Sequence, residues 1–425
     1  MHVLFYTPHW NTGGIERLIT YIVGGLSGRG YNFSILTEDY SRPYGQFSVD
    51  NARVYFRDFR PFNAENSQRL ASLLSAIAPD VVVAMGSSRA LYKPSRALIG
   101  QDIPVIMSEH NASKQMVKGF NNDWRFYNAV RDLADLNHVL FESYAEEYDK
   151  PEKVRVIGNP VLPTIERAYP IGGESWLVSL ARYDLHQKQQ DVLVRSFASI
   201  AERHPTWKLA LYGEDWKGGR AEVQRLASTL GLGDRVTING STSDVSSVLN
   251  KAKLLAFPSA YEGFPLAAGE ALAHGVPIIG FSDCDGVNQL VTNGYNGLLA
   301  GPGVKNVKAF AEAMSNAMAN EDLRISMAAN ARKSVEAYTL DAFLQAWASL
   351  LDEAHAIRGK NRLKTLTRME QEYIQLVASG TLFDEIHRHR TESRKNAKLV
   401  RGVERILSNP SLRRVAKFAW KRIVR

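Results

Sequence analysis

Residues 254–280 read LLAFPSAYEGFPLAAGEALAHGVPIIG, and this stretch indicates the fold. Its first apolar run, Leu254–Phe257, has the length and composition of a short buried strand. Pro265 suits the first position of a helix, and Gly275 supplies the C-terminal cap of that helix. Val276–Ile279 is the next expected buried strand. A strand, a loop, a helix and a strand in this order make one unit of a parallel sheet.

Packing does not require the two glutamates of this stretch, Glu262 in the loop and Glu270 in the helix. They stand eight residues apart, which along a helix is roughly 12 Å. The loop amides from Gly263 to Leu266 lie at the helix N-terminus, where unpaired N–H groups and the helix dipole favour an anion. An elongated ligand with sugar hydroxyls, a diphosphate and ribose hydroxyls would suit this geometry. On the local sequence alone, a turn role for Glu262 and a helix-favouring role for Glu270 explain the pair equally well.

The composition is that of an ordinary globular protein. The chain has 425 residues, of which 45% are hydrophobic and 23% charged, enough for two core domains and additional segments. Its only cysteine is Cys284, which excludes an intrachain disulfide and favours a reducing cytoplasm. Residues 2–6 already have the pattern of a strand, so we expect no signal peptide, and no apolar run is long enough to span a bilayer.

The positive charge belongs to one end of the chain. Residues 358–425 hold 18 Lys and Arg against 6 Asp and Glu, a net of +12, whereas residues 1–357 have a net of −4. Within this basic tail, residues 411–425 read SLRRVAKFAWKRIVR, with an apolar helical stripe and basic residues largely outside it. The pattern suits a helix at the surface of an anionic membrane. A helix docked on the protein itself or on a partner has the same pattern.

The first half of the chain alternates expected strands with helical patterns. The strands are expected at Val3–Tyr6, Phe33–Leu36, Val81–Ala84, Val105–Met107 and His138–Phe141. After the first strand, Gly13 and Gly14 permit close approach of a ligand and open another helix N-terminus, although a tight turn explains them equally well. His110 follows a strand at the edge where open α/β sheets bind ligands, and a structural role for this histidine has equal weight.

The second half restarts the same alternation. A Pro- and Gly-rich segment, residues 159–173, is the expected linker. Arg182 and Lys188 follow the next strand, Trp176–Leu180, where two cations could neutralise a diphosphate. A solvated basic turn is the commoner role of such a pair. Further strands are expected at Leu209–Tyr212 and Val236–Asn239, which end at Gly213 and Gly240.

Taken together, these residues resemble the retaining glycosyltransferases of family 4, which have the GT-B fold. The resemblance runs from Met1 to about Ala354, and its most specific part is the E-x7-E pattern of Glu262 and Glu270. The supporting segments are TGGIER (residues 12–17), SEHN (residues 108–111), Arg182 with Lys188, and DGVNQLVTNGYNGLL (residues 285–299).

The resemblance implies an α/β protein with two Rossmann-like parallel-sheet domains that face each other across a central cleft. Residues 1–165 would form the acceptor domain and residues 174–338 the nucleotide-sugar domain. Residues 339–357 would form a crossover helix that packs back on the first domain, with Trp347 in its apolar stripe. Residues 358–425 lie beyond the resemblance, and their own pattern predicts the basic amphipathic helical tail.

The resemblance also implies a role for each site residue. Glu262 would hold hydroxyls of the donor sugar and Glu270 the ribose, while Arg182 and Lys188 would bind the diphosphate. His110 would sit beside the reacting sugar, so the catalytic set would be His110, Arg182, Lys188 and Glu262. The donor would also contact the glycine-bearing loops and the loop before the helix, at Gly13, Gly14, Gly213, Gly240, Gly263, Phe264, Pro265 and Leu266.

Three departures from the family pattern bear on these roles. The family often has five steps from the Arg to the Lys and a Gly after the Lys, whereas this chain has six steps and Gln189. The common G-x-G is Gly213-Glu214-Asp215 here, and the usual Asn-Gly before the linker is Gly158-Asn159-Pro160. The first departure concerns the reach of Lys188, and the second concerns recognition of the base.

Together with the single cysteine and the basic tail, this resemblance leads us to predict a cytoplasmic enzyme, peripheral at the inner face of the membrane, whose tail contacts the anionic surface. It would move a hexose or N-acetylhexosamine, with retention, from a nucleotide sugar (a UDP-sugar favoured) to a glycan or glycolipid acceptor. The pathway would be cell-envelope polysaccharide assembly, such as that of lipopolysaccharide. The nucleotide sugar is a co-substrate, so no cofactor is expected.

Neither a metal nor a nucleic-acid partner is expected. The cationic pair and the helix amides would stabilise the departing diphosphate without a metal. Two other functions stay open at this point. One is a nucleotide-sugar epimerase or hydrolase of the same fold, and the other is a non-catalytic nucleic-acid-binding protein that uses the basic tail.

Overall fold

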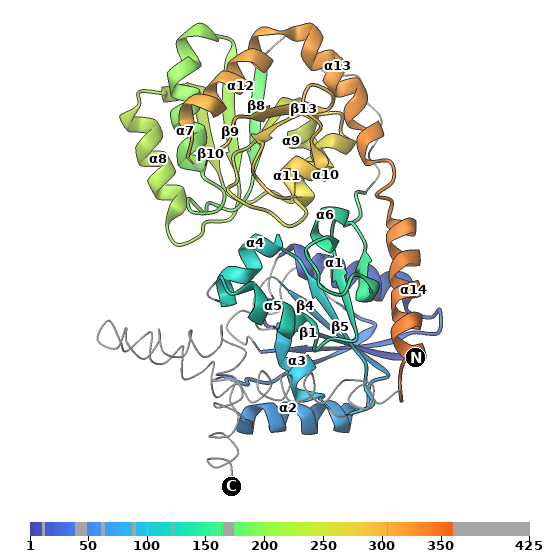
Figure 1. Cartoon of the computed structure of the whole chain (residues 1–425). Helices are drawn as coiled ribbons and strands as arrows, with labels where there is room; N and C mark the ends of the chain where they lie inside the picture. Colours follow the sequence, from blue (N-terminus) through green and yellow to red (C-terminus); the bar gives the residue numbers. More distant parts are fainter. Residues whose placement is uncertain are drawn as a thin grey trace, which may run out of the picture.

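The computed structural model of the chain describes residues 1–10, 13–38, 49–60, 64–86, 91–99, 101–120, 122–162, 164, 174–303 and 305–359. These residues form two lobes, each built on a parallel sheet (Figure 1). The predicted pair of Rossmann-like α/β domains is therefore confirmed. The interfacial helix expected at residues 411–425, Thr12 of the TGGIER segment and most of the expected linker lie outside the described residues.

The first sheet is parallel throughout, with the strand order β3-β2-β1-β4-β5-β6-β7. Its strands are β1 (His2–Thr7), β2 (Asn32–Thr37), β3 (Ala52–Phe56), β4 (Val81–Gly86), β5 (Val105–Glu109), β6 (Leu136–Val139) and β7 (Val154–Val156). The chain reverses its direction across the sheet between β1 and β4, and a crevice opens at the carboxyl ends of strands at such a point.

The second sheet is also parallel, with the order β10-β9-β8-β11-β12-β13. Its strands are β8 (Ser175–Leu180), β9 (Trp207–Tyr212), β10 (Val236–Asn239), β11 (Ala252–Phe257), β12 (Ile278–Phe281) and β13 (Gly297–Ala300). The order reverses between β8 and β11. The predicted strand at Val236–Asn239 matches β10, and the one predicted at Val276–Ile279 begins two residues later, after Pro277.

Helices cover both faces of each sheet, as long right-handed connections between parallel strands require (Figure 1). In the first domain they are α1 (Gly14–Leu26), α2 (Ala64–Ile77), α3 (Tyr92–Ala97), α4 (Ser113–Met116), α5 (Trp124–Arg131) and α6 (Glu142–Ala145). In the second they are α7 (Gln190–Ile200), α8 (Gly219–Thr229), α9 (Val245–Lys251), α10 (Leu266–Ala273), α11 (Val287–Leu290), α12 (Val307–Ala319) and α13 (Glu321–Ala331).

The residues of β1 divide between two apolar layers because successive side chains of a strand point to opposite faces. Val3 and Phe5 pack with residues of α1, whereas Leu4 and Tyr6 pack with Leu70 and other residues of the opposite face. Both faces of β1 are thus buried.

The last described helix, α14 (Leu340–Ala356), runs along the side of the first domain (Figure 1). Thr339 caps its start, because the Thr339 hydroxyl accepts a hydrogen bond from the amide of Ala342 at 3.1 Å. Trp347 is fully buried, with its ring centroid 6.5 Å from that of Phe5 and 4.9 Å from that of His138. A helix that follows the second domain in sequence therefore completes the core of the first.

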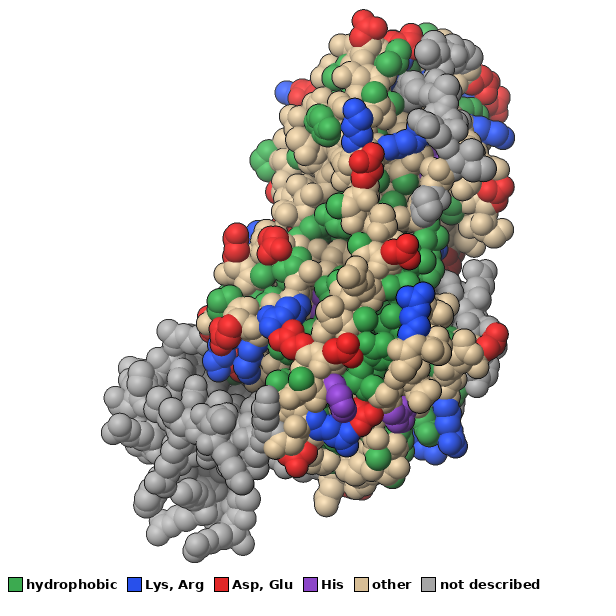
Figure 2. Space-filling model, turned by 90° about the vertical axis from the view of Figure 1, so that its right-hand side faces the viewer, with side chains coloured by type: hydrophobic (Ala, Val, Ile, Leu, Met, Phe, Trp, Pro, Cys, Tyr) green, Lys and Arg blue, Asp and Glu red, His purple; other side chains and the backbone are tan. Residues whose placement is uncertain are grey.

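Charge is mixed on the surface that carries α14. Figure 2 shows acidic and basic side chains interspersed over this face of both lobes. The distribution agrees with the small net charge of −4 for residues 1–357. Among the described helices, none is long and apolar enough to cross a membrane.

Candidate active site

The loop between β11 and α10 is held by backbone contacts on both sides. The amide of Glu262 donates to the carbonyl of Asp285 at 3.0 Å, and the amide of Ala260 donates to the carbonyl of Gln187 at 2.8 Å. We call residues 258–265 the donor loop. The donor loop is therefore hydrogen-bonded to the loop after β8 and to the loop after β12, at the carboxyl edge of the second sheet.

Helix α10 begins and ends close to where the sequence predicts. Pro265 is the residue before its first turn, one position earlier than predicted, with φ −75° and ψ 97°. Gly275 has φ +71°, which is the left-handed conformation of a helix C-terminal cap. A proline side chain cannot cap a helix, so the first N–H groups of α10 have no side-chain acceptor from Pro265.

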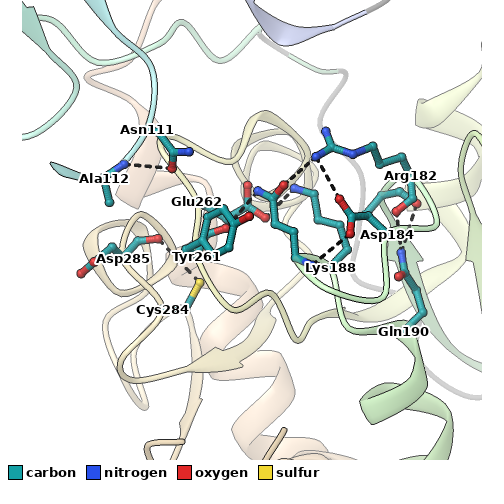
Figure 3. A network of polar contacts seen from close by, with 12 residues as sticks. Asn111, Ala112, Arg182, Asp184, Lys188, Gln190, Tyr261, Glu262, Cys284 and Asp285 are labelled. Atoms are coloured by element: carbon teal, nitrogen blue, oxygen red, sulfur yellow. Dashed lines mark hydrogen bonds and ion pairs between the residues drawn. The ribbon is translucent and has the colours of Figure 1, made fainter. Parts of the chain in front are cut away.

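Lys188 reaches the donor loop. Its Nζ lies 2.5 Å from Oε1 of Glu262, and both side chains are almost fully buried. Figure 3 shows this pair in one network with Arg182 and Asp184. The extra residue between Arg182 and Lys188 therefore does not prevent Lys188 from facing Glu262.

Asp184 stabilises the conformation of the loop after β8 by accepting hydrogen bonds from its backbone. Oδ1 of Asp184 accepts hydrogen bonds from the amides of His186 and Gln187, both at 3.1 Å. Burial acts to raise the pKa of Asp184, but these amides and the charge of Arg182 outweigh it, and the pKa is lowered. The ionised carboxylate also binds Nη2 of Arg182 at 3.2 Å, so Arg182 is directed by its own loop.

Gln189 explains one departure from the family pattern. It precedes α7 with φ 50° and ψ 45°, the left-handed region in which glycine is unstrained. The backbone thus keeps the conformation that a glycine would adopt at this position. Gln189 is fully buried, and its Oε1 accepts a hydrogen bond from the amide of Lys305 at 3.4 Å.

Two helix N-termini from different domains meet at this site. Gly14 opens α1, and a Cβ atom on Gly14 would lie 3.2 Å from Cδ1 of Leu266, the first residue of α10. One turn further along each helix, Nη1 of Arg17 binds Oε1 of Glu270 at 2.7 Å. The positive ends of two helix dipoles therefore converge between the domains, and the Arg17–Glu270 ion pair bridges them.

The donor loop also contacts the first domain directly. A Cβ atom on Gly263 would lie 2.4 Å from the carbonyl oxygen of His110, so only glycine fits there. Phe264 stacks on Phe141 with ring centroids 5.2 Å apart, and the hydroxyl of Tyr144 donates to the carbonyl of Gly263 at 3.3 Å. The loop that carries Glu262 is thus packed between the domains.

Gly213 and Gly240 lie together at the outer end of the same edge, because the amide of Gly213 donates to the carbonyl of Gly240 at 3.2 Å. A Cβ atom on Gly213 would lie 1.9 Å from the carbonyl oxygen of Ala181, which requires glycine. Asp215 takes the place of the second glycine of the family motif, and its Oδ1 accepts from the amide of Arg220 at 2.9 Å. The departure thus supplies a carboxylate to the start of α8.

His110 belongs to a buried chain of polar groups. Its Nε2 lies 2.9 Å from Oγ of Ser108, which lies 2.8 Å from Nδ1 of His138. Nε2 of His138 lies 2.9 Å from the carbonyl oxygen of Ile157. Burial lowers the pKa of His138 to about 4, and burial together with His138 lowers the pKa of His110 well below its usual value. Both rings are therefore neutral at pH 7.

Glu109 anchors the same segment on its other side. Arg131 binds Oε2 of Glu109 at 3.0 Å, and its guanidinium lies 3.8 Å from the ring centroids of both Tyr127 and Tyr148. Both tyrosine hydroxyls donate to Oε2 of Glu109. Burial and this carboxylate raise the pKa of both tyrosines well above their usual value, so they stay protonated donors.

The structure thus gathers most of the predicted site residues around the donor loop: His110, Gly13, Gly14, Lys188, Glu262, Gly263, Phe264, Pro265, Leu266 and Glu270. Arg182, Gly213 and Gly240 lie at the outer end of the same carboxyl edge. Sequence reasoning gave no role to Arg17, Ser108 or His138. Ser108 and His138 carry only a weak signal, since each stands next to a second polar residue of its strand, Glu109 in β5 and Asn137 in β6.

Comparison with known proteins finds two family models that match the chain. The model of the family described as "Glycosyltransferase Family 4" matches residues 12–164, and that described as "Glycosyl transferases group 1" matches residues 163–334. The two matches meet at the expected linker and together span both domains. The chain belongs to the family 4 glycosyltransferases. The predicted family membership is therefore confirmed.

Two relatives and one solved structure of similar fold illustrate how this glycosyltransferase compares with other proteins. An uncharacterized glycosyltransferase of Haemophilus influenzae is 24% identical over 352 residues, which are 80% of this chain and 97% of the relative. The N,N'-diacetylbacillosaminyl-diphospho-undecaprenol alpha-1,3-N-acetylgalactosaminyltransferase of Campylobacter jejuni is 35% identical over 136 residues, 32% of this chain and 35% of the relative. The structure of Anabaena HepE in complex with UDP and glucose superposes with a TM-score of 0.66 at 18% identity, covering 83% of this chain and 100% of HepE.

The buried His138 makes the stability of the glycosyltransferase depend on pH. A histidine whose pKa is about 4 when folded and 6.5 when unfolded takes up its proton on unfolding between these values. The free energy of unfolding should therefore fall by on the order of 3 kcal/mol as the pH falls from 6.5 to 4. Urea unfolding at a series of pH values measures this dependence.

The variant His138→Phe should lack this part of the pH dependence while keeping a ring against Trp347. His355→Phe, which replaces an exposed histidine of α14, should behave as the wild type. Equal pH dependence in the wild type and in His138→Phe would show that His138 does not titrate with a lowered pKa.

Proposed function

We propose that this glycosyltransferase moves a hexose or N-acetylhexosamine from a nucleotide diphosphate sugar, with a UDP-sugar favoured, to a hydroxyl of a glycan or glycolipid acceptor. The anomeric configuration is retained. The observation that carries the proposal is the meeting of two helix N-termini and two cation–carboxylate pairs around one loop between the domains.

The arrangement suits a ligand with a diphosphate in its middle. The N-termini of α1 and α10 supply amides and positive dipole ends, and Lys188 supplies a buried cation. Glu262 and Glu270 lie on either side of these amides and offer carboxylate oxygens to hydroxyl groups, Glu262 to the donor sugar and Glu270 to the ribose. Each carboxylate is paired with a cation in the described structure, so a bound donor would take over these partners.

The same groups favour cleavage of the sugar–phosphate bond. As the bond breaks, negative charge grows on the departing diphosphate and positive charge on the sugar. Lys188, Arg182 and the helix amides stabilise the diphosphate, so the proposed chemistry is independent of a metal. The acceptor hydroxyl attacks from the face of the leaving group and gives its proton to the diphosphate, which preserves the configuration.

Names of relatives support the choice of substrates. The Campylobacter jejuni relative is named for transfer of N-acetylgalactosamine to a sugar on diphospho-undecaprenol, and the Anabaena structure contains UDP and glucose. We therefore place this chain in polysaccharide assembly at the cell envelope, cytoplasmic and peripheral at the inner face of the membrane. The sugar acceptor would be carried by that membrane.

Substitutions at the proposed nucleotide-sugar site distinguish residues that bind the nucleotide sugar from residues that accelerate its turnover. A screen of UDP- and GDP-sugars by thermal shift identifies the donor, because a ligand at a hundred times its Kd stabilises the folded state by about 2.7 kcal/mol. Glu270→Ala should weaken donor binding roughly tenfold. Arg182→Ala should lower kcat by roughly a hundredfold, since it loses stabilisation of the leaving group. Activity of the wild type should survive EDTA.

Arg195→Ala, which replaces an exposed arginine of α7, is the matched control and should leave both quantities unchanged. Wild-type kinetics in Glu270→Ala and Arg182→Ala, with both proteins folded, would refute the site. An activity abolished by EDTA and restored by a divalent ion would refute the metal-independent chemistry. Consumption of the donor at the same rate with and without acceptors would indicate a hydrolase.

The basic tail is the proposed attachment to the membrane. Each Lys or Arg near an anionic surface contributes on the order of 1 kcal/mol, and residues 358–425 carry a net charge of +12. Binding to anionic vesicles should weaken as salt rises and weaken further in Trp420→Glu. Deletion of residues 411–425 should release the protein from vesicles while leaving donor binding intact, as measured by vesicle sedimentation and thermal shift.

The two kinds of acceptor test what the tail does for turnover. Deletion should lower turnover of an acceptor embedded in vesicles and leave turnover of a soluble analogue nearly unchanged. Equal losses on both acceptors would indicate a structural tail instead. Unaltered vesicle binding after the deletion would place the membrane surface elsewhere on the protein.

A further inference from the structure

The chain of polar groups behind His110 has a defined direction. Ser108 and His138 are register partners in the neighbouring parallel strands β5 and β6, so their side chains lie next to each other. Both residues are fully buried. The chain ends at the carbonyl oxygen of Ile157, which can only accept a hydrogen bond. This acceptor determines every donor and acceptor before it.

The protons can be assigned one after another from that carbonyl. A neutral His138 has one N–H, which must be at Nε2 to donate to Ile157, so Nδ1 of His138 carries a lone pair. The hydroxyl of Ser108 then donates to this Nδ1 at 2.8 Å. Its oxygen is left to accept from His110 at 2.9 Å, which requires the proton of His110 to be on Nε2. If the Ser108 hydroxyl donated to His110 instead, a lone pair on Oγ of Ser108 would face the lone pair on Nδ1 of His138.

The remaining nitrogen of His110 is therefore an acceptor. His110 is only half-buried, and its carbonyl lies against Gly263 of the donor loop. Within the part of the chain that the structure describes, Nδ1 of His110 has no hydrogen-bond partner. A lone pair at this position accepts from a hydroxyl group and repels a phosphate oxygen. His110 thus differs in kind from the cations Arg182 and Lys188.

We propose that Ser108 and His138 are positioning residues, which fix His110 as the tautomer with its proton on Nε2 and its Nδ1 lone pair directed to a hydroxyl group of the bound sugar. The part of this inference that concerns the sugar rests on the proposed function, whereas the tautomer does not. The ring of His138 is itself packed against Trp347 of α14. Helix α14 thus supports the hydrogen-bond relay that runs from the carbonyl of Ile157 through His138 and Ser108 and orients His110.

Nuclear magnetic resonance of the full chain labelled with ¹⁵N-histidine tests the tautomer directly. We expect His110 and His138 each to carry its proton on Nε2, with signals assigned by loss in His110→Gln and His138→Phe. Both imidazole N–H protons should exchange slowly with water, because each is held by a buried acceptor. In Ser108→Ala the protected proton of His110 should disappear, while that of His138, which is bound to the carbonyl of Ile157, should persist.

Ser196→Ala is the matched control, because Ser196 of α7 is also fully buried and its hydroxyl donates to the carbonyl of Val307 at 2.9 Å. It should leave both imidazole protons unchanged. A proton on Nδ1 of His110 in the wild type would overturn the proposal. So would a protected His110 proton that survives in folded Ser108→Ala.

Kinetics of a double-mutant cycle test whether Ser108 acts through His110. With the donor found by thermal shift, Ser108→Ala should lower kcat/KM by roughly tenfold, and His110→Ala should lower it further. The double variant should be no slower than His110→Ala alone, because the relay has nothing to orient once the imidazole is removed. Independent losses that multiply would overturn the positioning role. Absence of any donor would refute the proposed function and leave the tautomer test standing.

Discussion

The close approach of Gly263 to the carbonyl of His110 determines the rest of the site. A Cβ atom at residue 263 would lie 2.4 Å from that oxygen, so the donor loop and the first domain touch backbone to backbone. This contact packs the donor loop against the first domain, and in the same interface the first turn of α10 lies beside the first turn of α1. A side chain at residue 263 would separate the two helix N-termini that are proposed to hold the diphosphate.

The charges at the interface are balanced in pairs rather than left free. Lys188 is neutralised by Glu262, and Arg17 is neutralised by Glu270, although the second pair joins two domains. Desolvated charges are costly when unpaired, so Glu262 allows Lys188 to be almost fully buried before a ligand arrives. A diphosphate that brings its own negative charge can take over the cations, while the carboxylates become acceptors for hydroxyl groups. Binding would then exchange partners instead of creating unpaired charges.

Local sequence patterns predict helices and strands well where proline or glycine residues mark their ends. The apolar run before Pro258 and the cap at Gly275 bracket β11 and α10 within two residues. Pro277 has no N–H to pair, so β12 begins after it and not at Val276. The strand predicted at His138–Phe141 is β6, Leu136–Val139, because its register with β5 begins at Leu136. Strands β3, β7 and β13 were not predicted, and all three lie at sheet edges.

Only some of the residues of the candidate site could be predicted from the sequence. Glu262, Glu270, Arg182 and Lys188 were ambiguous one by one and became informative through the family resemblance. Arg17 and Glu270 are 253 residues apart, so no local pattern relates them. The direction of the relay from Ile157 to His110 depends on the register of β5 with β6 and on one carbonyl oxygen, which are properties of the folded chain.

Hydrogen exchange of the full chain with and without saturating UDP or GDP tests most directly whether one nucleotide bridges both domains. If one nucleotide does so, exchange should slow in peptides from both sides of the interface: residues 13–17 at the start of α1 and residues 261–270 of the donor loop and α10. Peptides of the edge strand β3 should be unchanged. Protection confined to one domain, or no protection of either helix N-terminus by a nucleotide that binds, would show that the nucleotide does not bridge the two domains.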